Sequence, residues 1–226
     1  MKRLRGSYVH RGDAERRRTR VKRYLLGAGL FGAALGAWDG PAAREAHASV
    51  WRGDDDVRAM RAQLDETRGA LDLANAQLQR WNRIYNYSSR YNIGADLAAS
   101  IHDIALAEGI EPELAFRLVK IESEFKERAT SPVGAIGLTQ LMLPTAKYFE
   151  KGVTRDGLYD RETNLRVGFR YLRALIREQK GNVPLALLVY NRGPLAVKKA
   201  QGEGVDPSNG YEHAVMKDFT GPATVD

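Results

Sequence analysis

The chain has 226 residues, of which 43% are hydrophobic and 28% charged, the composition of a soluble protein with room for one medium-sized domain and appended segments. It contains no cysteine, which excludes disulfide frameworks, cysteine metal sites and a lipid-modified N-terminal cysteine. Of the net charge of +7, residues 1–23 carry +8 and the rest of the chain −1. The basicity therefore belongs to a tail, and nucleic acid is not an expected partner.

An uncharged, apolar run of fifteen residues, Tyr24–Trp38, follows the basic tail. A basic segment before an apolar one is typical of an export signal, which keeps residues 1–23 in the cytoplasm and sends the rest across the cytoplasmic membrane. As a helix the run spans about 22 Å, shorter than a hydrocarbon core of about 30 Å, which favours a cleaved signal peptide. The long basic region favours an uncleaved signal anchor in the inner membrane instead. Either way, we expect a location in the periplasm or the cell envelope; a basic tail followed by a small apolar helix is the alternative.

A heptad pattern begins at Asp54, after an expected linker at residues 39–53, and predicts a long helix or coiled-coil segment over residues 54–92. Asp54–Asp56 would then lie at the helix start, where negative charge is favourable. The second core position of the heptad is weak, so the pattern leaves open a homodimer through residues 54–89 and a helix packed on its own domain. The two core positions hold Val57, Leu64, Leu71, Leu78 and Tyr85, and Met60, Thr67, Ala74, Trp81 and Ser88.

The remainder of the chain shows helical spacing of apolar residues, and no segment alternates convincingly as a strand. The predicted fold class is therefore mainly α, with one domain over residues 95–216 and a tail at 217–226. The expected helices are Ala95–Ala107, one from Pro112 to Phe125, a short one ending near Gly152, one capped by Asp160 and closed by Gly181, Leu185–Tyr190 and Tyr211–Phe219.

Glu122 is the candidate catalytic residue. In a helix that starts near Pro112, an apolar stripe of Leu114, Leu118, Ile121 and Phe125 surrounds Glu122, whereas Glu124 points the other way. A carboxyl group on an apolar face is costly to desolvate when charged, so its pKa tends to rise and it stays protonated when a proton donor is needed. The alternative is a helix-end glutamate that bends out to solvent or pairs with an arginine.

Five short motifs follow one another in an order that resembles a known family, the lysozyme-like soluble lytic transglycosylases that cut bacterial cell-wall peptidoglycan. The resemblance covers about residues 95–216 and implies a lysozyme-like transglycosylase domain. Three positions depart from the family pattern, namely Thr139, Pro144 and Val189. The motifs are Glu122-Ser123 after an apolar helix, Ser131-Pro132-x-Gly134-Ala135-x-Gly137-Leu138-x-Gln140, Asn164-x-x-x-Gly168-x-x-Tyr171-Leu172, Tyr190-Asn191-x-Gly193 and a late Tyr211.

The resemblance implies a mechanism that uses one carboxyl group. In the family, a glutamate protonates the oxygen bridging N-acetylmuramic acid and N-acetylglucosamine, then acts as a base while the sugar's own 6-hydroxyl attacks, which gives a 1,6-anhydro product. The resemblance assigns this role to Glu122, with Tyr190 hydrogen-bonded near it, and implies glycan strands of peptidoglycan as the partner. It assigns substrate binding to Ser123, Gln140, Met142, Tyr190, Asn191 and Tyr211.

No cofactor and no metal ion are expected, because His102 and His213 lack metal-ligand spacing and are more typical of surface histidines. Two other functions stay open. In a hydrolytic lysozyme, Asp156, Asp160 or Glu162 would face Glu122 across the cleft. In a non-catalytic wall-binding scaffold, the coiled coil would do the work and the domain would only dock glycan.

Overall fold

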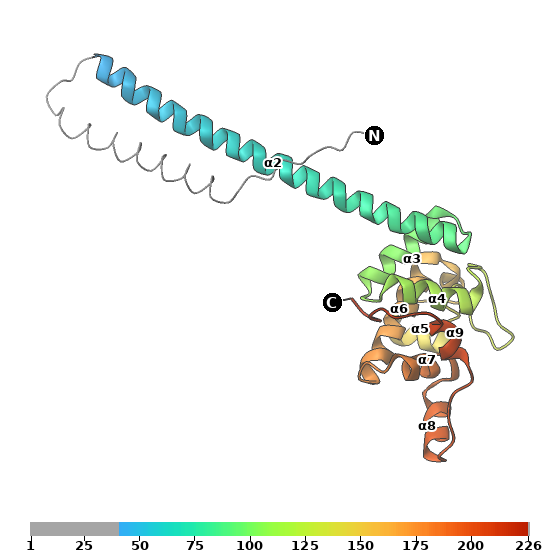
Figure 1. The fold of residues 1–226 in the computed structure, drawn as a ribbon. Helices are drawn as coiled ribbons and strands as arrows, with labels where there is room; N and C mark the ends of the chain where they lie inside the picture. Colours follow the sequence, from blue (N-terminus) through green and yellow to red (C-terminus); the bar gives the residue numbers. More distant parts are fainter. Residues whose placement is uncertain (1–40, 226) are drawn as a thin grey trace, which may run out of the picture. The chain divides into compact units, whose positions relative to one another are not determined.

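The structure is a computed structural model that describes residues 41–225, with side chains from residue 55 onward. Within that range the backbone forms helices and three isolated bridges but no strand, which confirms the mainly α fold class. The tail at 1–23 and the apolar run at 24–38 lie outside the described residues. The elements are α2 (Pro41–Tyr91), α3 (Ala95–Ala107), α4 (Pro112–Ser123), α5 (Leu143–Phe149), η1 (Asp156–Tyr159), α6 (Arg161–Glu178), α7 (Val183–Arg192), α8 (Pro194–Gly202) and α9 (Tyr211–Met216) (Figure 1).

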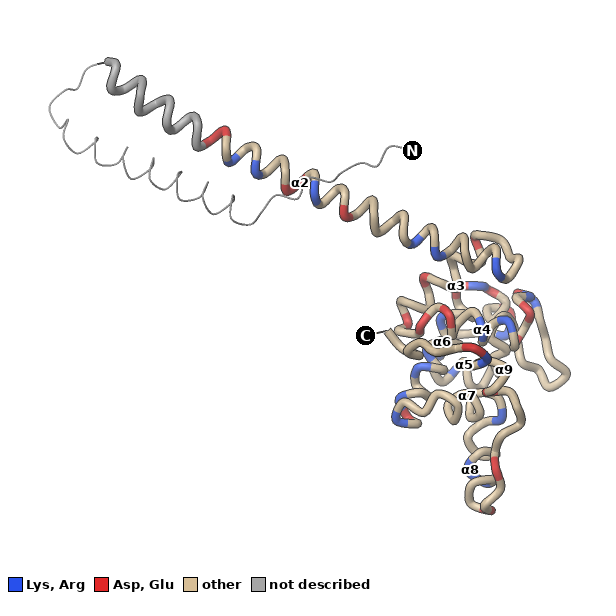
Figure 2. Tube along the Cα trace, viewed as in Figure 1, with Lys and Arg blue, Asp and Glu red and all other residues tan. Residues whose placement is uncertain are grey.

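The chain divides into two compact units, residues 1–72 and 73–226, and α2 contributes to both. The helix begins at Pro41 rather than at Asp54, so residues expected as a linker are helical and Asp54–Asp56 lie inside the helix. Acidic and basic residues are both present along its described part up to Asp72, and beyond it the charged residues of α2 are all basic (Figure 2). In the first unit the heptad side chains are open to solvent, with Leu64 49% and Leu71 59% exposed. No helix in residues 41–225 is both long and apolar enough to cross a membrane.

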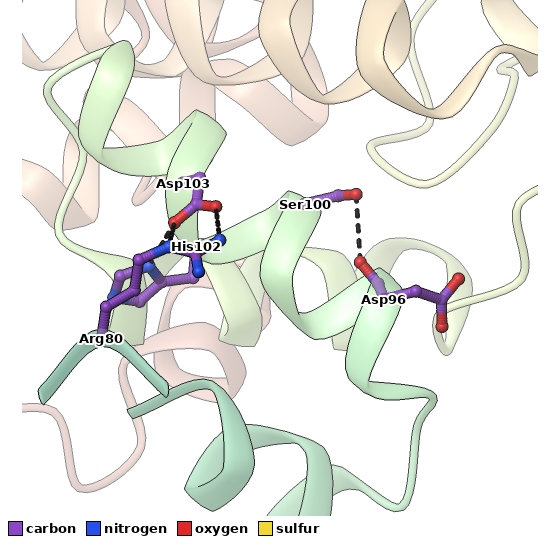
Figure 3. A network of polar contacts seen from close by, with 5 residues as sticks. All are labelled: Arg80, Asp96, Ser100, His102 and Asp103. Carbon is purple, nitrogen blue, oxygen red and sulfur yellow. Dashed lines mark hydrogen bonds and ion pairs between the residues drawn. The ribbon is translucent and has the colours of Figure 1, made fainter. Parts of the chain in front are cut away.

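The last turns of α2 belong to the second unit and are bound to α3 by a polar network (Figure 3). Arg80 Nε donates to Asp103 Oδ1 at 2.9 Å, and His102 Nδ1 donates to the same oxygen at 2.9 Å. Burial acts to raise the pKa of the Asp103 carboxyl, but these two partners hold it below its ordinary value. The expectation that His102 lies at the surface is wrong, since it is only 2% exposed, whereas His213 is exposed.

One hydrophobic core joins the end of α2 with α3, α4, α6, α7 and α9. Ile84 of α2 and Phe116 of α4 are among its fully buried members, so the end of α2 is part of this core. A second, smaller hydrophobic cluster involves α5 and η1 and includes Ile136, Leu141 and Leu158. As predicted, Asp160 caps α6 by accepting a hydrogen bond from the Thr163 N–H at 2.9 Å. α8, which packs on α7, was not predicted.

Candidate active site

α4 places Glu122 at its C-terminal end. The helix begins with Pro112, whose missing N–H costs nothing at that position, and it is anchored by Leu114 and Leu118, both fully buried. Ile121 is 41% exposed, so the apolar stripe is narrower than the sequence indicated. Glu122 is nevertheless partly buried. Burial raises the pKa of its carboxyl from an ordinary 4.5 to about 7, although a hydrogen bond from a tyrosine opposes the rise.

That tyrosine is Tyr211, the first residue of α9, whose hydroxyl donates to Glu122 Oε1. Tyr190, on α7, donates instead to the Thr139 carbonyl oxygen at 2.8 Å. Burial, and after it the negative charge of Glu122, raise the pKa of both phenols well above the ordinary value, so both stay protonated. The hydrogen-bond partner of Glu122 is thus Tyr211, while Tyr190, expected to hydrogen-bond near Glu122, bonds to the Thr139 carbonyl.

The loop that carries Thr139 is held by one buried side chain, Asn164 of α6. Asn164 Nδ2 donates to the Ile136 and Leu158 carbonyls at 2.9 Å each, and its Oδ1 accepts from the Thr139 N–H and hydroxyl at 2.8 Å each. Gly168 lies one helical turn further on, where an added Cβ would come within 2.3 Å of Thr139 Oγ1. Close packing of loop and helix thus fixes the carbonyl that anchors Tyr190.

Sequence reasoning missed Thr139 and Asn164 as parts of the site. In the sequence, Thr139 stood out only as a departure from the family pattern. In the structure, its hydroxyl donates a hydrogen bond to the Asn164 side chain. Gly137 gives the signal that connects them, because it adopts φ 76° and a Cβ there would meet Asn164 Nδ2 at 2.2 Å. Gly137 and Gly168 of the motifs thus both allow the close packing around Asn164 and Thr139, whereas a Cβ at Gly134 or Gly193 would meet nothing within 4 Å.

The other predicted substrate-binding residues lie in different environments. The Ser123 hydroxyl is buried and donates to the Val119 carbonyl at 3.1 Å, and Gln140 Nε2 donates to the Gly137 carbonyl at 2.9 Å. Met142 is 40% exposed, and exposed Asn191 accepts a hydrogen bond from Asn209 at 2.9 Å. The side chains of Ser123 and Gln140 thus donate hydrogen bonds to nearby backbone carbonyls, whereas those of Met142 and Asn191 are open to solvent.

The acids of the hydrolytic alternative have other roles or lie in solvent. The Asp160 carboxylate is occupied as the cap of α6, and Asp156 and Glu162 are exposed. Among the described residues no carboxylate contributes to the raised pKa of Glu122, which burial causes. A group of three or more side chains able to hold a metal ion is likewise missing from the described part of the chain.

Residues 99–209 match the family model described as "Transglycosylase SLT domain". A transglycosylase of Enterobacteria phage PRD1 is 36% identical over 116 residues, which are 51% of this chain and 36% of the phage protein. The soluble lytic murein transglycosylase of Escherichia coli strain K12 is 34% identical over 95 residues, 39% of this chain and 15% of that protein. The chain thus matches only a minor part of the length of these relatives.

A solved structure, the complex of the 70-kDa soluble lytic transglycosylase with bulgecin A, superimposes with a TM-score of 0.50. The match covers 62% of this chain and 27% of that one at 23% identity, a level that shows the fold alone. The all-helical arrangement around α4 agrees with that fold. Residues 99–209 of this chain therefore form a lysozyme-like transglycosylase SLT domain.

Proposed function

We propose that the chain is a peptidoglycan lytic transglycosylase that cleaves the β-1,4 bond between N-acetylmuramic acid and N-acetylglucosamine, with Glu122 as its single general acid and base. The observation that carries the proposal is the partly buried Glu122 carboxyl, with a pKa of about 7 and a hydrogen bond from Tyr211. Such a group is protonated up to neutral pH and becomes a competent base once it has given its proton away. The SLT domain and relatives named lytic murein transglycosylases support the substrate class.

The reaction needs two proton transfers through the same carboxyl group. Glu122 first protonates the bridging oxygen as the glycosidic bond breaks through an oxocarbenium-like state. The resulting carboxylate then takes the proton of the 6-hydroxyl of the same sugar, whose oxygen bonds to the anomeric carbon and closes a 1,6-anhydro ring. No water is consumed. The Tyr211 hydroxyl supports this cycle because its hydrogen bond orients the carboxyl group and favours the carboxylate that forms between the two steps.

The environment of Glu122 favours a mechanism that uses one catalytic carboxyl group over a mechanism that uses two. A hydrolytic lysozyme would require a second acid within reach of the sugar, and Asp160 is occupied by the N-terminus of α6. Asp156 and Glu162 are exposed and leave the pKa of Glu122 unaffected. For a scaffold that only docks glycan, a carboxyl group held partly buried at a raised pKa would have no use. We propose that the side chains contacting the glycan are Ser123, Gln140, Met142, Tyr190, Asn191 and Tyr211.

We also propose that the protein works in the cell envelope, exported or tethered through its N-terminal region. The apolar run at 24–38 after a basic tail supports this, as does a relative named membrane-bound lytic murein transglycosylase F from Shewanella woodyi. That relative is 34% identical over 97 residues, which are 38% of this chain and 19% of its own length. In this proposal residues 39–92 separate the membrane from the catalytic domain at about 95–216, and α2 provides a surface for a second copy.

Digestion of purified cell-wall sacculi tests the role of Glu122. Glu122→Gln keeps the shape of the side chain but removes the exchangeable proton, so release of soluble muropeptides should fall by about three orders of magnitude or more. Glu124→Gln is the matched control, because Glu124 is exposed and pairs with Lys126 at 2.7 Å, and it should retain activity within about twofold. Equal release by the wild type and Glu122→Gln would refute the proposal.

A further inference from the structure

The chain leaves α4 through two consecutive residues in the left-handed conformation, directly after Glu122 and Ser123. Glu124 has φ 51° and Phe125 has φ 62°. Each residue with a Cβ atom in this conformation costs roughly 1–2 kcal/mol, which is why glycine usually occupies such positions at the end of a helix. Neither position is glycine here. The turn that ends α4 is therefore strained and depends on the contacts of its side chains.

Phe125 supplies those contacts, because the Glu124 side chain is exposed and pairs with nearby Lys126. The Phe125 ring packs against Tyr91, with a centroid distance of 5.2 Å, and against Phe116 at 6.5 Å. Tyr91 in turn lies parallel to Phe116 at 5.5 Å. Phe116 belongs to α4 itself, so Tyr91 is the ring that ties the turn to a different element.

Tyr91 is the last residue of α2 and lies outside residues 99–209, the segment that matches the family model. Its own position is well fixed. Tyr87, one turn earlier, stacks on Phe116 at 4.1 Å, and Arg90 Nη1 pairs with the Glu113 carboxylate of α4 at 2.8 Å. The Lys120 ammonium lies over the Tyr91 ring at 5.5 Å from its centroid. The end of α2 is thus attached to both ends of α4.

We infer that Tyr91 is a positioning residue for Glu122. Tyr91 packs against Phe125 and so stabilises the left-handed turn. That turn keeps the last residues of α4 helical and holds the Glu122 carboxyl at its hydrogen bond with Tyr211. In the described part of the chain, the Tyr91 ring contacts Phe116, Phe125 and Lys120, and it makes no hydrogen bond to the Glu122 carboxyl. The inference rests on the proposed role of Glu122, and it adds that a residue of α2, outside the matched domain, controls how well Glu122 performs that role.

Loss of the Tyr91 ring leaves the two strained residues without their external support. The turn then relaxes, the end of α4 frays and water reaches Glu122. Because burial is what raises the pKa of this carboxyl, the pKa falls towards its ordinary value when water enters. The general acid is then already deprotonated at neutral pH, so the alkaline limb of the pH–rate profile moves to lower pH and kcat at pH 7 falls.

The test compares the full-length chain with Tyr91→Ala, Tyr91→Phe and Ile84→Val. Two quantities are measured for each: the pH dependence of muropeptide release, and the titration of the Glu122 carboxyl carbon by NMR, assigned from the signal that disappears in Glu122→Gln. Tyr91→Ala should lower kcat at pH 7 by about 10-fold or more, with KM little changed, and shift both titrations down by about one pH unit. Tyr91→Phe keeps the ring, so its kcat at pH 7 and both of its titrations should be close to those of the wild type.

Ile84→Val is the matched control. It shortens a buried side chain of α2 in the same core, and Ile84 is not one of the rings that pack around Phe125. It should lower Tm while leaving the alkaline limb and the NMR titration near those of the wild type. If Tyr91→Ala does not fold, Tyr91→Leu, which keeps an apolar side chain but no ring, takes its place.

A Glu122 titration unchanged in Tyr91→Ala, or shifted equally in Ile84→Val, would overturn the inference. Failure of the proposed function gives a different result, namely no muropeptide release by the wild type or undiminished release by Glu122→Gln. The NMR titration does not depend on catalysis and decides the role of Tyr91 in that case as well.

Discussion

Glu122 occupies a position that serves proton transfer at the expense of stability. Burial favours its neutral form, and the Tyr211 hydroxyl favours the charged form without cancelling the effect of burial. The result is a carboxyl group that can exist in either state near pH 7, which suits a reaction in which one group gives a proton and then takes another. Tyr190 adds a second buried hydroxyl, held in place by the carbonyl of Thr139.

The stability cost of this arrangement depends on pH. In the folded protein the pKa of Glu122 is about 7, above its ordinary value of 4.5. As pH rises between these two values, the unfolded chain loses the proton while the folded protein keeps it. Folding is therefore destabilised progressively, by about 3 kcal/mol in all above pH 7, whereas below about pH 4 both states are protonated and the effect vanishes.

Glu122→Gln cannot titrate, so it should be more stable than the wild type at pH 8 by up to about 3 kcal/mol and nearly equal to it at pH 4. Urea unfolding at the two pH values measures both differences. A gain of the same size at pH 4 and pH 8 would mean that the mutation acts through packing and that folding does not raise the pKa of the carboxyl group.

The sequence predicted the partly buried environment of Glu122 but not its hydrogen-bond partner. Helical spacing is a local property, and it was sufficient to place Glu122 among apolar residues of α4. Which tyrosine reaches the carboxyl group depends on how α7 and α9 pack, and this is tertiary information. Tyr190 was therefore expected near Glu122, while Tyr211, known only as a late motif residue, makes the hydrogen bond.

At the level of elements, the loop between α4 and α5 depends on α6 for its conformation. Asn164 makes four hydrogen bonds to that loop and to the end of η1, and it is 1% exposed. Because these partners are buried, removal of the amide leaves several polar groups unsatisfied at once.

Asn164→Ala should therefore lower the free energy of unfolding by about 3 kcal/mol or more, as measured by urea denaturation. Asn182→Ala is the matched control. Asn182 is exposed and caps α7 with a single hydrogen bond from the Leu185 N–H at 3.1 Å, so its loss should cost about 1 kcal/mol. Similar costs for the two substitutions would show that the Asn164 network does not hold the loop.

α2 presents its heptad side chains to solvent, which is unusual for a row of large apolar residues. Leu78, at 59% exposed, and Trp81, at 55%, continue in the second unit the exposure found in the first. Such a stripe is covered when two heptad helices pack against each other. This supports the homodimer that we propose.

A fragment of residues 49–226 should accordingly sediment as a dimer, and Leu64→Gln combined with Leu71→Gln should make it a monomer whose domain stays folded. Ala62→Gln combined with Ala76→Gln introduces the same polar side chain on the opposite face of the helix, so this variant should remain a dimer. A monomer at a protomer concentration of about 100 μM would exclude the dimer at any physiologically relevant strength.

Several helices could be predicted because their signals lie within a few residues. Ala95–Ala107 and the start of α4 at Pro112 agree with the structure, and so does the Asp160 cap. The start of α2 was misplaced because Asp54–Asp56 resembles a helix N-terminus, whereas the helix continues back to Pro41. α8 was overlooked because its nine residues bury one apolar side chain, Val197, and so lack a clear apolar stripe.

For the whole molecule, the SLT domain and its proposed activity account for about half of the chain. The residues before it divide into a segment that packs with the domain, 73–91, and a segment that belongs to the other unit. If Tyr91 positions Glu122, the first of these segments is part of the catalytic apparatus although it lies outside the family match. The second would set the distance between the proposed membrane attachment and the cell wall.

In the proposed reaction, one carboxyl group completes the cleavage and no water is consumed. Mass spectrometry of sacculi digested by the wild-type chain measures this directly, because a 1,6-anhydro end is lighter by one water molecule than a reducing end. We predict 1,6-anhydro ends from the wild type, and none above background from Glu122→Gln. Reducing ends from the wild type would contradict the account and assign the protein to the hydrolases.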